Sequence, residues 1–388
     1  MPWKEVSTVS LRSDFIALAQ QQGANVALLA RRFGISRKTA YKWLGRTRGG
    51  GPDPLADRSR RPHTCPARTP APLEQLVLQL RDRHPAWGGR KLHARLRDAG
   101  WLHVPAPSTI TAILRRHGRL DGPRAGHQRA WQRFEHAAPN DLWQMDFKGH
   151  FGLTNGGRCH PLTVLDDHSR YALGLHACAD EQTETVQRHL TELFCRHGLP
   201  RRMLMDNGAP WGDDWEHPWT VLTVWLLRLG VAVSHGRPYH PQTQGKDERF
   251  HRTLNAELLS RRTFTDLTDC QGQFDPWRHV YNHERPHEAL GLAVPASRYR
   301  VSPRAFPAQL PPIEYDAADV VRRVQDKGRF CFGGRVYQVA KAFRGYPIAL
   351  RDTGQDGVLG VWFCAHRLGY LDLRRGVVQR HAPAEELG

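Results

Sequence analysis

The sequence predicts a multidomain α/β protein with helix-turn-helix modules at the N-terminus, a mixed α/β core and a small C-terminal β-barrel. Helical periodicity dominates the first 120 residues, strand and helix patterns alternate over 139–300, and short strand patterns fill 312–388. The expected domains are a first helix-turn-helix at 10–48, a linker at 49–72, a second helix-turn-helix at 73–120, the core at 139–300 and the barrel at 312–388.

The positive charge of the chain is concentrated at its N-terminal end. The first 139 residues hold 25 Lys and Arg but only 9 Asp and Glu, so they carry +16 of the formal net charge of +18. Such asymmetry indicates a polyanionic partner. Nucleic acid is the usual one, because Lys and Arg release its condensed counterions on binding. A merely basic, soluble surface is the alternative.

Several classes of protein are disfavoured by composition. None of the seven Cys forms a CxxC pair, and no Cys/His cluster has zinc-ligand spacing. The longest apolar runs, such as 221–229, are too short to span a bilayer, and the opening MPWKEVSTVS does not resemble a signal peptide. We therefore expect neither a disulfide framework nor a membrane partner, and a reducing, cytoplasmic location.

The first helical module has the pattern of a helix-turn-helix. Val26, Leu29, Ala30 and Phe33 recur at helical spacing, Gly34 interrupts them, and Ser36 can cap a helix over 37–44. The second helix would place its first residues against base edges in the major groove. The expected DNA-contacting residues are Arg37, Lys38, Thr39, Tyr41 and Lys42. An ordinary helical hairpin is the alternative.

The linker at 49–72 is rich in Gly and Pro and contains Arg58, Arg60 and Arg61. These arginines could follow phosphates or enter a minor groove, or they could simply be solvated. Three more helices are expected at 73–84, 90–98 and 108–116, the last capped by Ser108, and they would form the second helix-turn-helix. Two such modules on a flexible linker would bind an extended DNA site with increased avidity.

The core is expected to alternate strands and helices. Paired strands are predicted at 162–165 and 171–176, short strands at 203–205 and 231–234, and helices at 181–197, 219–229 and 244–260. In the C-terminal region, Gly333-Gly334 predicts a hairpin over 329–339, with further strands at 348–350, 358–363 and 368–373.

Three carboxylates stand out in the core. Asp146 alternates with the apolar residues of WQMDFK, Asp206 ends the buried run MLM before Asn-Gly, and Glu248 lies opposite the Phe250 stripe of its helix. Taken singly, each could be a strand-edge, turn or solvated residue. Taken together, they match phosphodiester strand transfer, which uses two divalent cations held by carboxylates, Mg²⁺ or Mn²⁺.

The motifs WQMDFKG, MDNG, RPYHPQTQGKDERFHRTL and YNHERPHEAL resemble the DDE integrase-type transposases of bacterial insertion sequences, in particular the insertion-sequence 481 and 3 group. ARRFGISRKTAYKWL, LADRSRRPH and HPAWGGRKLHARL are similar to the N-terminal segments of that group. The resemblance implies an RNase H-like catalytic core with Asp146, Asp206 and Glu248 as catalytic metal ligands. It also implies magnesium, binding of double-stranded element ends and target DNA, a homo-oligomer assembled on DNA, and a place at the bacterial nucleoid.

Further residue roles follow from the same resemblance. It places Lys246, Arg249, His251 and Arg252 near bound DNA. It makes Tyr239, Pro241 and Gln242 a loop ahead of the Glu248 helix, and it makes the turn of Asp166 or Asp167 with Ser169 structural.

The sequence departs from the family pattern at two points. The 41 residues between Asp206 and Glu248 are more than is usual, with the surplus at 211–219, so Asp213, Asp214 and Glu216 compete for the role of third ligand. Asp247 replaces the usual apolar neighbour of the catalytic Glu.

Two other functions remain open at this point. One is a prophage or retroelement-type integrase or nuclease, although the chain lacks the HHCC zinc module of retroviral proteins. The other is a catalytically idle, transposase-derived DNA-binding regulator, whose mark would be a broken carboxylate set.

Overall fold

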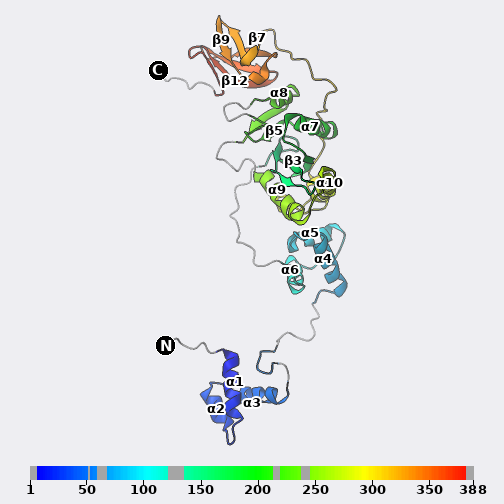
Figure 1. The fold of residues 1–388 in the computed structure, drawn as a ribbon, viewed down its shortest axis with the longest axis vertical. Coiled ribbons are helices and arrows are strands. Elements are labelled where there is room, and N and C mark those ends of the chain that lie inside the picture. The colour runs from blue at the N-terminus through cyan, green and yellow to red at the C-terminus, as the bar shows by residue number, and fades with distance from the viewer. Residues whose placement is uncertain are drawn as a thin grey trace. The chain divides into compact units, whose positions relative to one another are not determined.

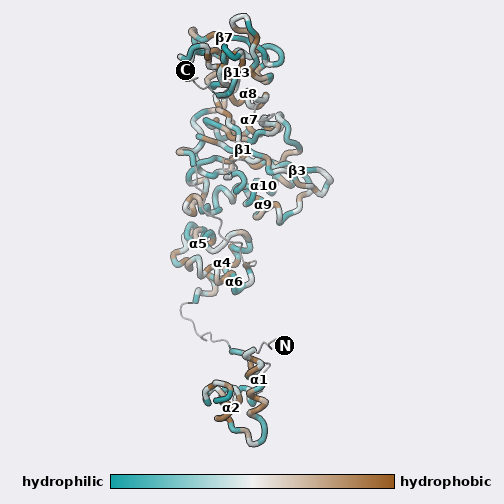
Figure 2. Tube along the Cα trace, turned by 90° about the vertical axis from the view of Figure 1, so that its left-hand side faces the viewer, coloured by the Kyte–Doolittle hydropathy of each residue, from teal (hydrophilic) through white to brown (hydrophobic). Residues whose placement is uncertain are grey.

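The computed structural model describes residues 7–50, 53–58, 68–120, 135–212, 219–236 and 245–381. The chain divides into two compact units, Met1–Arg68 and Thr69–Gly388 (Figure 1). Hydrophobic residues are interspersed with hydrophilic ones along both units (Figure 2). Among the described helices, none combines the length and the apolar character that a membrane span requires.

The described part of the first unit is a three-helix module of α1 (Thr8–Ala19), α2 (Val26–Arg32) and α3 (Arg37–Arg48). Its core is built from Phe15, Ile16, Ala30, Ala40, Trp43 and Leu44. Gly34 has a φ of +64°, which its turn requires. The hydroxyl of Ser36 accepts the Thr39 N–H at 3.1 Å and so caps α3. The predicted helix, glycine turn and capped helix are confirmed.

A second group of three helices opens the second unit: α4 (Ala71–Arg83), α5 (Gly89–Asp98) and α6 (Pro107–Arg116). Helices α5 and α6 approach closely at Gly89, where a Cβ would lie 2.4 Å from the Pro107 carbonyl oxygen. The prediction that Ser108 caps the third helix is wrong, because α6 already begins at Pro107 and has no side-chain cap. Proline suits the first helical turn, since its φ is preset and it lacks an N–H.

A six-stranded mixed sheet follows the second helical module in the chain. Its order is β2-β3-β1-β5-β6, with β4 paired to β3 off this path. The strands are β1 (Trp143–Phe147), β2 (Phe151–Gly152), β3 (Arg158–Asp166), β4 (Ala172–Cys178), β5 (Arg202–Met205) and β6 (Ala232–His235). Strand β1 is antiparallel to β3 and parallel to β5, so it lies inside the sheet with neighbours on both sides.

Helices cover both faces of this sheet: α7 (Thr183–His197), α8 (Val221–Arg228), α9 (Gly245–Glu257) and α10 (Leu267–His283). Helices α7 and α8 pack with Trp143 and Met145 of β1 in one apolar cluster. Helices α9 and α10 pack with Leu165 and Leu175 in another. Because strand side chains alternate, Asp146 faces the side of α9.

Helix α10 was not predicted. Gly272 and Pro276 interrupt its helical pattern. It forms because Phe274, Trp277 and Tyr281 are buried against the sheet cluster, and because the Asp266 carboxylate caps its first turn. Tertiary burial here outweighs local propensity.

The C-terminal domain contains a five-stranded sheet in the order β13-β12-β11-β10-β7 and the hairpin β8-β9. Its strands are β7 (Val320–Arg323), β8 (Arg329–Phe332), β9 (Arg335–Gln338), β10 (Pro347–Asp352), β11 (Val358–Phe363), β12 (His366–Asp372) and β13 (Val377–Gln379). The predicted hairpin is confirmed, but the closed barrel is wrong: among the described strands, β13 and β7 end the sheet without pairing to each other. Val224 and Leu227 of α8 pack into this domain's core, and so help to cover it.

The close crossing of α5 and α6 predicts a large effect from one methyl group. Gly89→Ala should destabilise the second helical module by about 1–3 kcal/mol, because the added carbon meets a backbone carbonyl that cannot move aside. Hydrogen exchange of the full chain, read by mass spectrometry over α5 and α6, measures this loss of protection.

Gly45 on α3 provides the matched control, since a Cβ there would find nothing within 4 Å. Gly45→Ala should increase protection in its own module by about 0.4–1 kcal/mol. Unchanged exchange in α5 and α6 of Gly89→Ala would contradict the packing described here.

Candidate active site

Two of the predicted carboxylates occupy matching positions on neighbouring strands. Parallel pairing sets Trp143 of β1 beside Met203 of β5, and Gln144 beside Leu204. The same register, continued for two residues, brings Asp206 beside Asp146 on strands about 4.8 Å apart. The structure thus brings together two residues that lie far apart in the sequence.

Asp206 is held where β5 ends. Its carboxylate accepts the Asn207 N–H at 2.8 Å, and its carbonyl oxygen accepts the Nδ1–H of His235 at 2.9 Å. The Asn207 side chain in turn donates to the Gly236 carbonyl at 2.8 Å. The Asp-Asn-Gly segment is therefore an anchored turn that also presents a carboxylate.

Glu248 comes from α9, which contacts β1. Its side chain is exposed, whereas Phe250 and Leu254 of the same helix, and Leu258 just after it, are buried. This is the orientation predicted from the helical period. Glu248 lies close enough to Asp146 to raise the pKa of that carboxyl.

His251 connects α9 to strands β1 and β3. Its Nε2 is 2.8 Å from the hydroxyl of Thr163, and Thr163 pairs with Asp146 across β1 and β3 and donates to the Asp146 carbonyl at 2.9 Å. The Nδ1 of His251 is 4.0 Å from the Asp146 carboxylate. Burial, aided by Lys148, lowers the pKa of His251 to about 4. The imidazole is therefore neutral near pH 7 and does not offset the charge of Asp146.

The electrostatics at Asp146 are those of crowded like charges. Burial, followed by the nearby carboxylate of Asp206 and more weakly those of Glu181 and Glu248, raises the pKa of Asp146 to about 7. The Phe147 N–H, which lowers it, compensates only partly. Such crowding needs a counter-charge to be stable when all the carboxylates are ionised.

The three carboxylates do not converge on a single point. In the described part of the chain, only His176, His189 and Glu192 form a group whose potential ligand atoms all lie within 4.8 Å. That group lies on β4 and α7. Its two imidazole rings are stacked at 4.2 Å with 22° between their planes, so their in-plane lone pairs run nearly parallel and do not converge on one ion.

Lys246 has an intramolecular partner that the sequence did not reveal. Its ammonium group forms an ion pair with Asp167, next to the structural turn after β3. Asp167 also accepts the side-chain N–H of Gln144 at 2.7 Å and the His136 N–H at 2.9 Å. This pair ties the start of α9 to the sheet, two residues before Glu248. Contact of Lys246 with DNA stays a prediction.

Asp247 is a buried carboxyl without a hydrogen bond. Its side chain is 1% exposed, and neither carboxyl oxygen has a partner in the described structure. Burial, with Asp146 and Asp167 nearby, raises the pKa of Asp247 well above its ordinary value. Asp247 lies three residues before Phe250, on the buried face of α9. Its surroundings on the buried face of α9 therefore favour the protonated form of this carboxyl.

The remaining predicted DNA contacts are mostly solvent-accessible. On α3, Thr39 is half-buried and hydrogen-bonded to Ser36. The exposed residues are Arg37, Lys38, Tyr41, Lys42, Arg58, Arg249 and Arg252. Arg60, Arg61, the competing carboxylates Asp213, Asp214 and Glu216, and the loop residues Tyr239, Pro241 and Gln242 lie outside the described residues.

Family models match segments of the chain that correspond to the helical modules, the mixed sheet and the C-terminal domain. Two models described as integrase core domain match residues 136–241 and 229–295. A helix-turn-helix domain matches 14–63 and a homeodomain-like domain matches 39–114. The C-terminal domain of IS481 family transposases matches 319–379.

The relatives include proteins of insertion elements and retroviral polyproteins. A protein of insertion element IS476 from Xanthomonas euvesicatoria is 27% identical over 60% of this chain and 66% of its own length, just under two thirds. A protein named for insertion sequence element IS5376 of Geobacillus stearothermophilus is 21% identical over 95% of this chain and 89% of its own length. A chain of the simian T-cell lymphotropic virus intasome structure, 16% identical, covers 76% of this chain and 97% of itself at a TM-score of 0.36, too low to support an argument.

Fold and matches together define an integrase-core protein with N-terminal helix-turn-helix domains. The C-terminal region is similar to the C-terminal domain of IS481 family transposases, and two relatives are proteins of insertion elements.

The buried acid of α9 predicts a stabilising substitution. Asp247→Val should raise the free energy of unfolding by about 1–3 kcal/mol, because it removes a buried polar group that has no partner. The gain should grow with pH: the raised pKa means that the unfolded chain releases a proton above pH 3.8 that the folded chain retains, so the wild type loses stability as pH rises. Thermal unfolding at pH 5 and pH 8 measures both effects.

Asp275→Val is the control, because Asp275 on α10 has a side chain that is 54% exposed. Its effect should stay within about 0.5 kcal/mol and depend little on pH. A lower Tm for Asp247→Val than for the wild type at pH 8 would show that Asp247 has a partner in solution.

Proposed function

We propose that the protein is the transposase of a bacterial insertion sequence, which binds the ends of its element and catalyses metal-dependent DNA cleavage and strand transfer. The observation that carries this proposal is the register of β1 and β5, which sets Asp146 beside Asp206 under the helix that bears Glu248. Charge crowding at Asp146 supports the same conclusion, because such a cluster suits divalent cations.

The donor set fits Mg²⁺ or Mn²⁺, which prefer carboxylate oxygens. Ligands of one Mg²⁺ lie within about 4.2 Å of each other, given metal–oxygen distances of about 2.1 Å. The three carboxylates would together hold such ions, and two-metal sites of this chemistry place the ions about 4 Å apart. When bound, such ions activate the attacking hydroxyl and stabilise charge on the phosphorus oxygens.

The chain's own residues would supply rigidity and orientation. Strand β1 is paired on both sides, so Asp146 has little freedom. The ion pair of Lys246 with Asp167 fixes the first turn of α9 and hence the direction of Glu248. Neutral His251 holds Thr163 and leaves the negative potential at Asp146 available to cations.

DNA is the proposed partner of both the N-terminal helix-turn-helix module and the candidate active site. The exposed cations of α3 would read the element ends in a major groove, and Arg249 and Arg252 beside Glu248 would contact phosphates near the reacting bond. Transposition joins two element ends to one target, so we propose a homo-oligomer assembled on DNA, acting at the nucleoid in the bacterial cytoplasm.

Substitution of the carboxylates tests the chemistry. Asp146→Asn, Asp206→Asn and Glu248→Gln should each abolish cleavage and joining of end duplexes with Mg²⁺, while the affinity for the ends stays near that of the wild type. Gel assays of joining and titrations of end binding on the same preparations measure the two quantities. Strand transfer by Glu248→Gln at the wild-type rate would transfer the third-ligand role to Asp213, Asp214 or Glu216.

Arg37→Ala is the control, because it should weaken recognition of the ends and leave the chemistry of joining intact. It should weaken the preference for end duplex over scrambled duplex, by about 1–3 kcal/mol if Arg37 makes a bidentate base contact. Joining should recover at high DNA concentration, because the catalytic centre is intact.

A further inference from the structure

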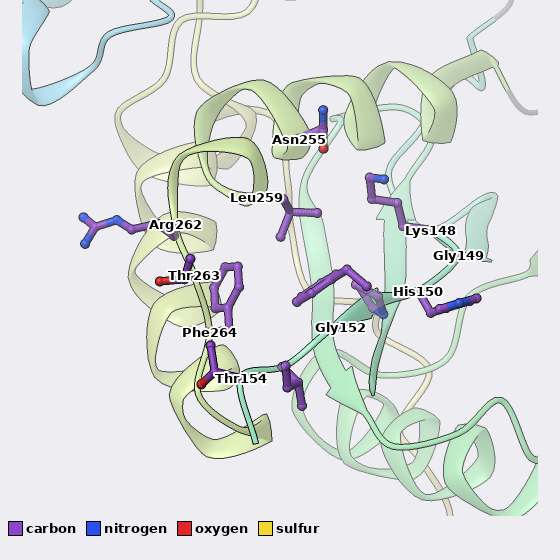
Figure 3. A pocket seen from close by; sticks show the side chains of 13 residues that line it. Lys148, Gly149, His150, Gly152, Thr154, Asn255, Leu259, Arg262, Thr263 and Phe264 are labelled. Carbon is purple, nitrogen blue, oxygen red and sulfur yellow. The ribbon is translucent and has the colours of Figure 1, made fainter. Parts of the chain in front are cut away.

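A hollow of about 610 Å³ lies beside the candidate active site (Figure 3). Its walls come from the residues after β1, from β2, from the C-terminal half of α9 and from the segment that leads to α10. None of its lining residues carries a carboxylate. Its volume falls in the range of small-molecule pockets, about 300–1,000 Å³.

Two residues that line the hollow lie on the same faces as the candidate catalytic carboxylates, one just after β1 and one on α9. Lys148 follows Asp146 by two residues, so an extended chain puts both on one face about 7 Å apart. Asn255 follows Glu248 by seven residues, which is two helical turns and about 10 Å along the same face of α9. Lys148 and Asn255 both line the hollow (Figure 3). Its mouth therefore lies within one or two nucleotides of the reacting phosphodiester.

The lining combines apolar and polar chemistry. Half-buried Leu259 contributes apolar surface from one wall and half-buried Phe151 from β2, while Phe264 is buried behind them. Lys148 has no ion-pair partner among the described residues, and the Asn255 amide is exposed. A phosphate alone would make no favourable contact with the apolar side chains. An uncharged aliphatic ligand would make none with the Lys148 ammonium group. A nucleotide makes both contacts, because its base has a flat apolar face and its phosphate is an anion.

The walls are fixed before any ligand arrives. The Thr154 N–H donates to the Phe264 carbonyl at 2.9 Å, and the Asn155 N–H donates to the Thr265 carbonyl at 3.2 Å. The rings of Phe151 and Phe264 lie 5.2 Å apart. These contacts join the segment around β2 to the segment before α10. Binding would therefore cost little ordering of the protein.

We propose that this hollow holds one unpaired nucleotide of the DNA next to the reacting phosphodiester, with its base against Leu259 and Phe151 and its phosphate at Lys148. The proposal rests on the function proposed above and adds a subsite to it. An enzyme that opens the duplex beside its reacting bond gives its carboxylates access to the phosphodiester, and a place for the displaced base lowers the free-energy cost of unstacking.

Gly152 gives a way to close the hollow without touching the catalytic carboxylates. It lines the hollow, a Cβ there would meet nothing within 4 Å, and its φ lies outside the left-handed region. Gly152→Leu should fill the space with little backbone strain. Gly272→Leu is the matched control, because Gly272 on α10 is equally open and lies outside the hollow.

The test places 2-aminopurine, whose fluorescence rises on unstacking, at successive positions of an end duplex bound to the full-length protein without divalent metal. For the wild type and Gly272→Leu we expect increased fluorescence at one position beside the joining phosphate. Gly152→Leu should lose that increase while binding the duplex with nearly the same affinity. Joining by Gly152→Leu should recover on a duplex that lacks the base at that position.

Two results would overturn the proposal. One is the absence of any fluorescence increase in a wild-type protein that binds and joins the ends, and the other is an undiminished increase in Gly152→Leu. Failure of the proposed function is a separate outcome, in which the wild type neither prefers end duplex to scrambled duplex nor joins it with Mg²⁺.

Discussion

Strand β1 pairs in parallel with β5 and antiparallel with β3, and that pairing sets the positions of Asp146 and Asp206. The register sets Asp206 beside Asp146. The alternation of β1 turns Asp146 toward α9 and leaves Trp143 and Met145 for the opposite core. A shift of one residue would turn Asp146 into the apolar cluster of α7 and α8 and remove Trp143 from it, so the packing of the core and the geometry of the site require the same register.

Desolvation and mutual repulsion of carboxylates disfavour the assembly of the candidate site. Burial and, after it, the neighbouring carboxylates raise the pKa of Asp146, and a second carboxyl, Asp247, is buried beside it without a hydrogen bond. Both features lower stability in the absence of a counter-charge. The apolar packing of α9 through Phe250 and Leu254, and the ion pair of Lys246 with Asp167, oppose this repulsion. Binding of cations would relieve it, which couples metal binding to the stability of the core.

The sequence pattern correctly predicted the features that depend on neighbouring residues in the chain. The alternation in WQMDF gave the face of Asp146, and Gly34 with Ser36 gave the first helix-turn-helix. Structure that depends on long-range contacts could not be predicted from the local pattern. Helix α10 forms through burial despite Pro276, and α8 helps to cover a C-terminal sheet that does not close. The ion pair of Asp167 with Lys246 joins residues that lie 79 positions apart in the sequence. His251 was expected at the DNA, and its hydrogen bond to Thr163 depends on a strand pairing that the sequence does not display.

Diffraction from crystals grown with Mn²⁺, with anomalous differences measured at the manganese edge, tests the central claim most directly. Two peaks about 4 Å apart are expected, with Asp146 contacting both and Asp206 and Glu248 each contacting one. Ordered Mn²⁺ bound elsewhere, for example between His176 and His189, with none at Asp146 and Asp206, would contradict the assignment of the catalytic centre.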